Sequence, residues 1–201
     1  MTTSCYKHPP PVVARRAAFT LIEMLLVVMV ISILFGILLS AIRTVERHTL
    51  QTVTRGEIKN IENAWKQYFA HYQMWPTNQP DQQLINDEIA LALQGIIPDD
   101  VNPYSTLNPD RVVFMEFSRF NADGTPLNAW GESGRHNKDA CSYYVAFDID
   151  GDNQLKLVED KIQALPNNWP PPFTNSVLPR GVIVWSYNPA ADNKVLGSWQ
   201  Q

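Results

Sequence analysis

The longest apolar run of the chain lies near its amino terminus. From Phe19 to Ile42 the sequence reads FTLIEMLLVVMVISILFGILLSAI, and Glu23 is its only charged residue. An α-helix rises about 1.5 Å per residue, so a run of this length covers the roughly 30 Å hydrocarbon core of a bilayer. The run therefore predicts a membrane-spanning helix.

Basic residues precede this apolar run. Arg15 and Arg16 lie just before it, and no Asp or Glu occurs among residues 1–18. Positively charged flanks favour the cytoplasmic side of a membrane. We therefore expect the start of the chain in the cytoplasm and everything after Arg43 on the other side.

A second helical pattern continues from Arg43 to Tyr72. Apolar residues recur there at steps of three and four, which is typical of a helix with one apolar face. They are Leu50, Val53, Ile58, Ile61, Ala64, Trp65, Tyr68, Phe69 and Tyr72. Proline disfavours helical geometry in the residue before it, so Trp75-Pro76-Thr77 is predicted to follow the end of this helix.

The rest of the chain mixes a short helical pattern with strand patterns. A second helix is predicted from Asp81 to Leu93, with Gly95 as its stop. Residues 97–110 contain three prolines and are predicted to form a loop. Four β-rich runs bounded by Gly, Pro, Asn or Asp are predicted strands. They are Arg111–Phe117, Ser142–Asp148, Leu155–Val158 and Val182–Tyr187.

These patterns predict an α+β fold. The pair Asp150-Gly151 favours a tight hairpin between the second and third predicted strands. An antiparallel sheet of about four strands, packed against the apolar face of the long helix, would bury both surfaces. The fold is therefore expected to combine one long amino-terminal helix with a small sheet.

Charge and cysteine content narrow the classes of function. The formal net charge is -4, and the chain has no cluster of Lys and Arg of the kind that phosphate binding needs. Nucleic acid is therefore not an expected partner. Cys5 and Cys141 lie on opposite sides of the apolar run and are not expected to pair, so Cys141 is predicted to be a small buried residue.

The start of the apolar run resembles the type IV prepilin signature. The matching residues are Ala18-Phe19-Thr20-Leu21-Ile22-Glu23-Met24-Leu25-Leu26, although family members usually have Gly where this chain has Ala18. The resemblance implies that a membrane peptidase removes residues 1–18 by cutting between Ala18 and Phe19, and that Phe19 is N-methylated. It also implies that Glu23 neutralises the new terminal amine of a neighbouring subunit. The alternative is that Glu23 simply reaches the lipid headgroups.

Later segments resemble the major pseudopilin of type II secretion. They are Phe114 to Phe117, Ala129-Trp130-Gly131, the Asp148 hairpin and Val184-Trp185-Ser186. The resemblance implies a pilin-like fold with a membrane half at 19–42, an amphipathic half at 43–72 and a periplasmic domain at 73–201. It further implies a non-enzymatic inner-membrane subunit with no catalytic residues, which polymerises with itself and with other pseudopilins. The prepilin peptidase and a membrane assembly platform would be its other partners.

Two other functions remain open at this point. One is a minor or adhesive subunit of a type IV pilus or a DNA-uptake pilus. The other is a single-pass anchored binding protein or enzyme, which would keep residues 1–18.

One acidic pattern matches the ligand spacing of a calcium loop. Three carboxylates at alternate positions and a later glutamate supply the hard oxygen ligands that this cation prefers. They are Asp148, Asp150, Asp152 and Glu159. Asn153 stands where the calcium motif has Gly, and a plain turn prefers the same residue types. The family resemblance adds Asp192 as a second candidate ligand, and no other cofactor is expected.

Overall fold

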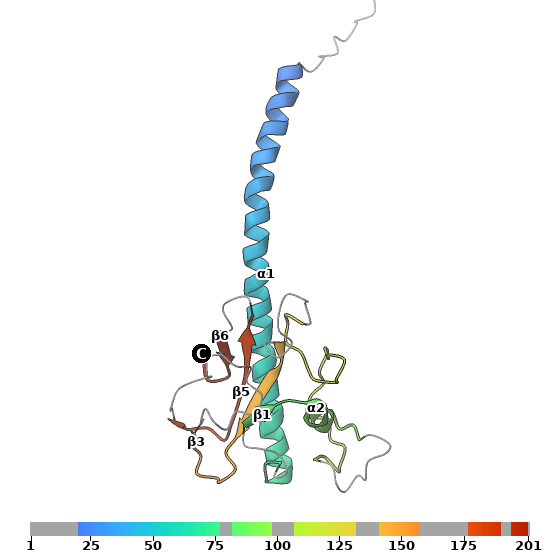
Figure 1. Cartoon of the computed structure of the whole chain (residues 1–201), viewed down its shortest axis with the longest axis vertical. Helices are drawn as coiled ribbons and strands as arrows, with labels where there is room; N and C mark the ends of the chain where they lie inside the picture. Colours follow the sequence, from blue (N-terminus) through green and yellow to red (C-terminus); the bar gives the residue numbers. More distant parts are fainter. Residues whose placement is uncertain are drawn as a thin grey trace, which may run out of the picture. The chain divides into compact units, whose positions relative to one another are not determined.

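The computed structural model describes residues 20–76, 82–97, 107–131, 141–156, 177–189 and 194–200. The chain forms two compact units, Met1–Thr44 and Val45–Gln201. Helix α1, Leu21–Tyr72, contributes residues to both units (Figure 1). The predicted long helix is thus present, and it ends at the predicted residue.

The first unit contains the apolar part of α1. Its large apolar side chains between Leu21 and Leu39 are exposed, so no described protein surface covers them. Among the described residues, α1 is the one helix long and apolar enough to cross a membrane. Exposed apolar surface of this extent is what a lipid-facing helix presents.

The second unit is built on a four-stranded antiparallel sheet in the order β1-β2-β5-β6. The bounds of these strands are Gln82–Leu84, Tyr143–Phe147, Val182–Asn188 and Lys194–Gly197. Val145 of β2 lies opposite Val184 of β5, so the two central strands pair along their apolar residues. Strands β3 (Leu155–Lys156) and β4 (Val177–Leu178) form a separate two-stranded sheet.

One face of the four-stranded sheet packs against the carboxy-terminal part of α1. Alternate residues of a strand point to opposite faces, and the first, third and fifth residues of β2 join the helix in one core. Trp65 is fully buried there and meets the ring of Phe147 edge-on, with centroids 4.8 Å apart. Ile58, Ile61, Ala64 and Tyr68 complete the helical side of this core. The predicted α+β, pilin-like arrangement is therefore confirmed.

The opposite face of the sheet is also buried. A second core holds Tyr144, Ala146, Ile183, Trp185, Tyr187 and Val195. The rings of Tyr144 and Trp185 stack with centroids 5.6 Å apart. Strands that are buried on both faces read as continuous apolar runs, which explains why β2 and β5 were evident in the sequence. Cys141, next to β2, is fully buried as predicted.

The predicted helix from Asp81 to Leu93 is wrong in its first half. Gln82–Leu84 forms strand β1, which pairs with Tyr144–Ala146, and helix α2 begins only at Asp87 and ends at Gln94. Asn86 caps α2 by accepting the Ile89 N–H at 3.1 Å, which leaves the preceding residues free to join the sheet. Gly95 ends α2 in a left-handed conformation with φ of 67°, as predicted.

Two strand predictions are also wrong. Arg111–Phe117 runs without a strand partner in the described part of the chain, because Asn108 and Leu93 anchor its start instead of a sheet edge. Strands β2 and β3 do not form a hairpin, since they belong to different sheets. The turn around Gly151 therefore connects two sheets, and β4 and β6 were not predicted.

Candidate functional site

The first turn of α1 holds the candidate assembly residue, Glu23. Thr20 precedes the helix, and its Oγ1 accepts the backbone N–H of Glu23 at 3.3 Å. A threonine cap followed three residues later by glutamate has the spacing of a capping box. The backbone of the helix start is therefore stabilised by residues that lie after the predicted cleavage point.

The Glu23 side chain is exposed among apolar neighbours that include Leu21, Ile22 and Met24. An acidic residue at the centre of a membrane helix costs about 2.5–3.5 kcal/mol on insertion scales, and Glu23, in the first turn, lies nearer the boundary of the apolar run. The positive end of the helix dipole offsets only part of such a cost, typically about 0.3–1 kcal/mol. The cationic partner expected for Glu23 stays a prediction.

The two predicted processing residues, Ala18 and Phe19, lie outside the described residues, as does the rest of the segment 1–18. Their cleavage and methylation stay predictions.

Residues 13–39 match the family described as the prokaryotic N-terminal methylation motif. This match includes the predicted cleavage point, Glu23 and most of the apolar run. Neither the curated proteins nor the solved structures compared with this chain include a match. The motif and the confirmed fold together support a type IV pilin-like protein. Such a motif implies processing by a prepilin peptidase and polymerisation with pilin-like subunits.

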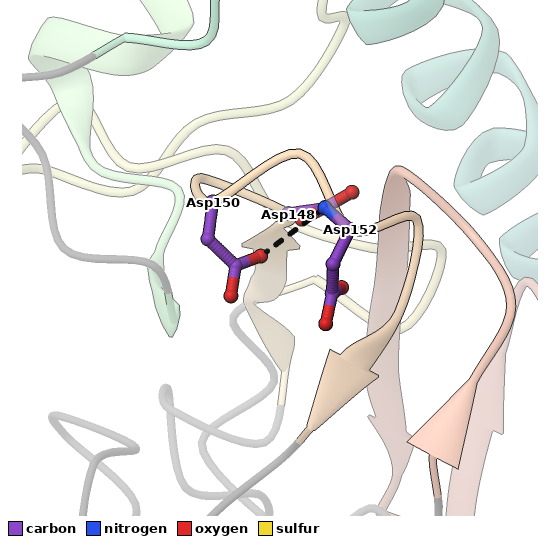
Figure 2. Close-up of side chains that lie close together, drawn as sticks. All are labelled: Asp148, Asp150 and Asp152. Carbon is purple, nitrogen blue, oxygen red and sulfur yellow. Dashed lines mark hydrogen bonds between the residues drawn. The ribbon is translucent and has the colours of Figure 1, made fainter.

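The second candidate site is the loop that follows β2. Asp148, Asp150 and Asp152 are brought together, and one carboxylate oxygen from each lies within 4.8 Å of the other two (Figure 2). Asp148 accepts the N–H groups of Gly151 at 2.9 Å and Asn153 at 2.7 Å. The dashed line in Figure 2 is the 3.5 Å hydrogen bond from the Asp152 N–H to the Asp150 carboxylate.

The electrostatics of this loop centre on Asp148, which is buried, whereas Asp150 and Asp152 are exposed. Burial raises the pKa of the Asp148 carboxyl, and so does the hydrogen bond with Asp150. The N–H donors of Asn153 and Gly151 lower that pKa and offset part of the increase. The cluster offers hard oxygen ligands of the kind that calcium prefers, while the backbone hydrogen bonds are those of an ordinary turn.

The other predicted calcium ligands, Glu159 and Asp192, lie outside the described residues. Calcium usually takes six to eight oxygen ligands, about twice the number of carboxylate groups that the described loop supplies. Calcium binding therefore stays a prediction.

A buried carboxylate that was not singled out in the sequence joins α1 to the sheet. Glu62 is 1% exposed, and its Oε1 lies 2.7 Å from Lys66 Nζ and 3.3 Å from an Arg180 nitrogen. Lys59 Nζ lies 3.5 Å from Glu62 Oε2 and donates to the Ser198 carbonyl at 2.6 Å. This cluster ties the helix to the open end of the strand pair β5–β6, where β5 begins after Arg180 and β6 ends before Ser198.

Burial alone would raise the pKa of Glu62, but the hydrogen bond and charge of Lys66, with the charge of Lys59, outweigh it. The pKa of Glu62 is therefore held below its ordinary value. The spacing of Lys59, Glu62 and Lys66 along one helix was a visible signal for this cluster. Arg180 carried no such signal, because it lies far away in the sequence.

A second polar contact between helix and sheet involves Glu57. One of its carboxylate oxygens accepts the Tyr143 hydroxyl at 2.5 Å, and the other pairs with Arg119. Burial raises the pKa of the Tyr143 hydroxyl, and the charge of Glu57 raises it further. Tyr143 thus stays a neutral donor to the helix carboxylate.

Proposed function

We propose that this protein is a pseudopilin, a structural subunit whose short filament drives type II protein secretion. The single observation that carries the proposal is a matched N-terminal methylation motif on an apolar helix that has one carboxylate in its first turn. The resemblance of later segments to the major pseudopilin is the reason to propose secretion rather than another use of the motif.

The proposed mechanism begins with cleavage between Ala18 and Phe19. Cleavage leaves a terminal amine, which is positively charged below its usual pKa of about 8 and stays basic when it is N-methylated. In the filament this amine lies against Glu23 of a neighbouring subunit. Two groups that are unfavourable in lipid then neutralise each other, so the charge pair favours association and sets the axial register between subunits.

Growth of the filament supplies the movement that secretion needs. The subunit waits in the inner membrane with its amino terminus in the cytoplasm and the unit that contains the sheet in the periplasm. Addition of subunits by a membrane assembly platform moves these periplasmic domains outward and pushes cargo towards an outer-membrane pore. This role requires no catalytic residue and no nucleic acid.

The decisive experiment for processing is the intact mass of the protein purified from its native host. Loss of residues 1–18 with the gain of one methyl group is the expected result. A chain that still begins at Met1 would instead favour the single-pass anchored binding protein or enzyme.

A second experiment separates secretion from the pilus alternative, which the same motif fits. Deletion of the gene should leave secreted proteins trapped in the periplasm while surface pili persist. Loss of surface pili or of DNA uptake with normal secretion would assign the chain to a pilus instead.

A further inference from the structure

A cavity of about 630 Å³ lies between the end of α1, the loop after β2 and the start of β5. Pockets that hold small molecules usually have volumes of about 300–1,000 Å³ and mostly apolar walls. The end of α1 and the residues after it contribute Phe69, Met74 and Trp75, the loop contributes Ile149, and β5 contributes Val182. The cavity therefore has the size and the lining of a small-molecule site.

Ring contacts and a close backbone approach fix the inner wall of the cavity. The centroid of the Trp75 ring lies 4.5 Å from that of Phe69 and 5.2 Å from that of Phe147. Gly181 approaches Trp75 so closely that an added Cβ would lie 3.3 Å from the indole ring. Trp75 therefore has little room to turn into the cavity and fill it.

Three large apolar side chains that border the cavity are exposed. Phe69, Met74 and Ile149 are 38%, 57% and 48% exposed. Gln73, which precedes Met74, has a φ of 56°, an unfavourable conformation for a residue that carries a Cβ. Exposed apolar surface and strained backbone both raise the free energy of the empty site, and both are features that gather at binding sites.

The two charged side chains that border the cavity already have partners in the fold. Lys66 Nζ lies 2.7 Å from Glu62 Oε1. The Asp148 carboxylate accepts the N–H groups of Gly151 and Asn153. Lys66 and Asp148 also have opposite charges, so neither sign dominates the lining. The lining therefore favours an uncharged ligand over an ionic one.

We infer that this cavity binds a small, uncharged, planar aromatic molecule. A planar ring can stack on the rings of Phe69 and Trp75 or meet them edge-on, as aromatic pairs do. The thioether of Met74 also favours a ring, because contacts between sulfur and an aromatic ring are favourable. An aliphatic molecule of equal size would gain burial but neither of these contacts. The site is separate from Glu23, and the inference does not depend on assembly into a filament.

The first test is methionine methyl NMR on the full chain in lipid nanodiscs, with naphthol as the probe. The Met74 signal should shift and saturate, with a dissociation constant of about 1 mM or below for a ligand of this size. Met24 and Met29, in the apolar run, report partition of naphthol into the lipid, which does not saturate. Met115 does not border the cavity, so its signal should stay in place. A Met74 signal without saturation up to about 5 mM naphthol would overturn the inference.

Two analogues of the probe test the class of ligand. Decahydronaphthol keeps the two rings and the hydroxyl but is not aromatic, and it should bind about threefold more weakly or worse. Naphthoate brings a negative charge towards Asp148 and the last carbonyl groups of α1, so it should also bind more weakly. Equal or tighter binding by either analogue would overturn the assignment to an uncharged aromatic ligand.

A matched pair of phenylalanine variants tests the location of the site. Phe69→Ser removes a ring from the wall and should weaken naphthol binding about fivefold. Phe120 is 42% exposed and does not border the cavity, so Phe120→Ser should leave binding unchanged within about twofold. Equal effects of the two variants would overturn the site.

A third variant makes the result independent of any change in α1. Ile149→Ser alters only the loop after β2 and should also weaken binding, because it removes apolar surface from the cavity. Unchanged binding by both Ile149→Ser and Phe69→Ser would overturn the site. A Met74 signal that moves with protein concentration in the absence of naphthol would make a second copy of the chain the occupant, which also overturns the inference.

Discussion

Replacement of Glu62 by Gln should destabilise the unit that contains the sheet more than the other glutamate replacements on α1. The side chain is 2% exposed and faces three cations, Lys59, Lys66 and Arg180. Gln is nearly isosteric and keeps one oxygen acceptor, but it removes the charge that compensates these cations. The hydrogen-bond network also loses its charge-assisted character.

The size of the expected loss in stability depends on how deeply Glu62 and its cationic partners are buried. Loss of one partner of a fully buried pair costs about 3–5 kcal/mol. Here the side chains of Lys59 and Lys66 are 42% and 55% exposed, so water can solvate them after the change. We therefore expect a loss of about 2 kcal/mol in the free energy of unfolding at pH 7, near the value of a charged hydrogen bond.

The loss should depend on pH in a defined direction. The pKa of Glu62 is lowered in the fold from its ordinary value of 4.5, so its charge stabilises the fold above that value. The stabilisation disappears as the pH falls through the folded pKa, because the protonated side chain then resembles Gln. The difference between the wild type and Glu62→Gln should therefore shrink in acid.

Urea unfolding of the full chain in micelles, followed by tryptophan fluorescence, measures this difference because Trp65 lies in the core, one helical turn after Glu62. Glu46→Gln, at an exposed helix position, is the matched control and should stay within about 0.5 kcal/mol of wild type. Wild-type stability for Glu62→Gln at pH 7, or a loss of the same size in acid, would refute the reasoning.

Three further predictions test other parts of the molecule. Glu23→Ala should insert and be cleaved but form few oligomers after chemical cross-linking, and normal oligomers would remove the charge-pair mechanism. If calcium binds at the Asp148 loop with the weak affinity of extracellular modules, a tenfold excess over the dissociation constant should stabilise the wild type by about 1.4 kcal/mol, and Asp148→Asn should abolish the gain. If added calcium leaves the urea midpoint of the wild type unchanged, the loop is a plain turn and not a calcium site. Gly95→Ala should cost at least about 1 kcal/mol in urea unfolding, because an added Cβ would lie 2.6 Å from the Arg111 carbonyl at a φ of 67°. Wild-type stability of that variant would contradict the strain.

Local patterns in the sequence were sufficient for the long helix. The apolar run and the recurrence of Ile58, Ile61, Trp65 and Tyr68 both depend on residues within a few positions of one another. Glu23 could also be singled out from the sequence, because it is the only charged residue in the apolar run. The Asp148 cluster followed from its spacing in the same way.

Strands were predictable where burial left a continuous apolar run, as in β2 and β5, and the predicted run that begins at Leu155 contains β3. The three residues of β1 carry no such pattern, and they form a strand because Tyr144–Ala146 lies beside them. Arg111–Phe117 has the composition of a strand but lacks a partner in the described structure. Composition therefore decided strand preference, whereas distant residues decided strand pairing.

The sequence alone thus determined the long apolar helix, its charged first turn and the α+β class, since each depends on local spacing or total apolar content. The tertiary structure alone decided the sheet order and the burial of Glu62 beside Arg180. A strand pair or an ion pair of this kind joins groups that are far apart along the chain. Such contacts stabilise the fold only after the loops between them have closed, so local sequence patterns do not reveal them.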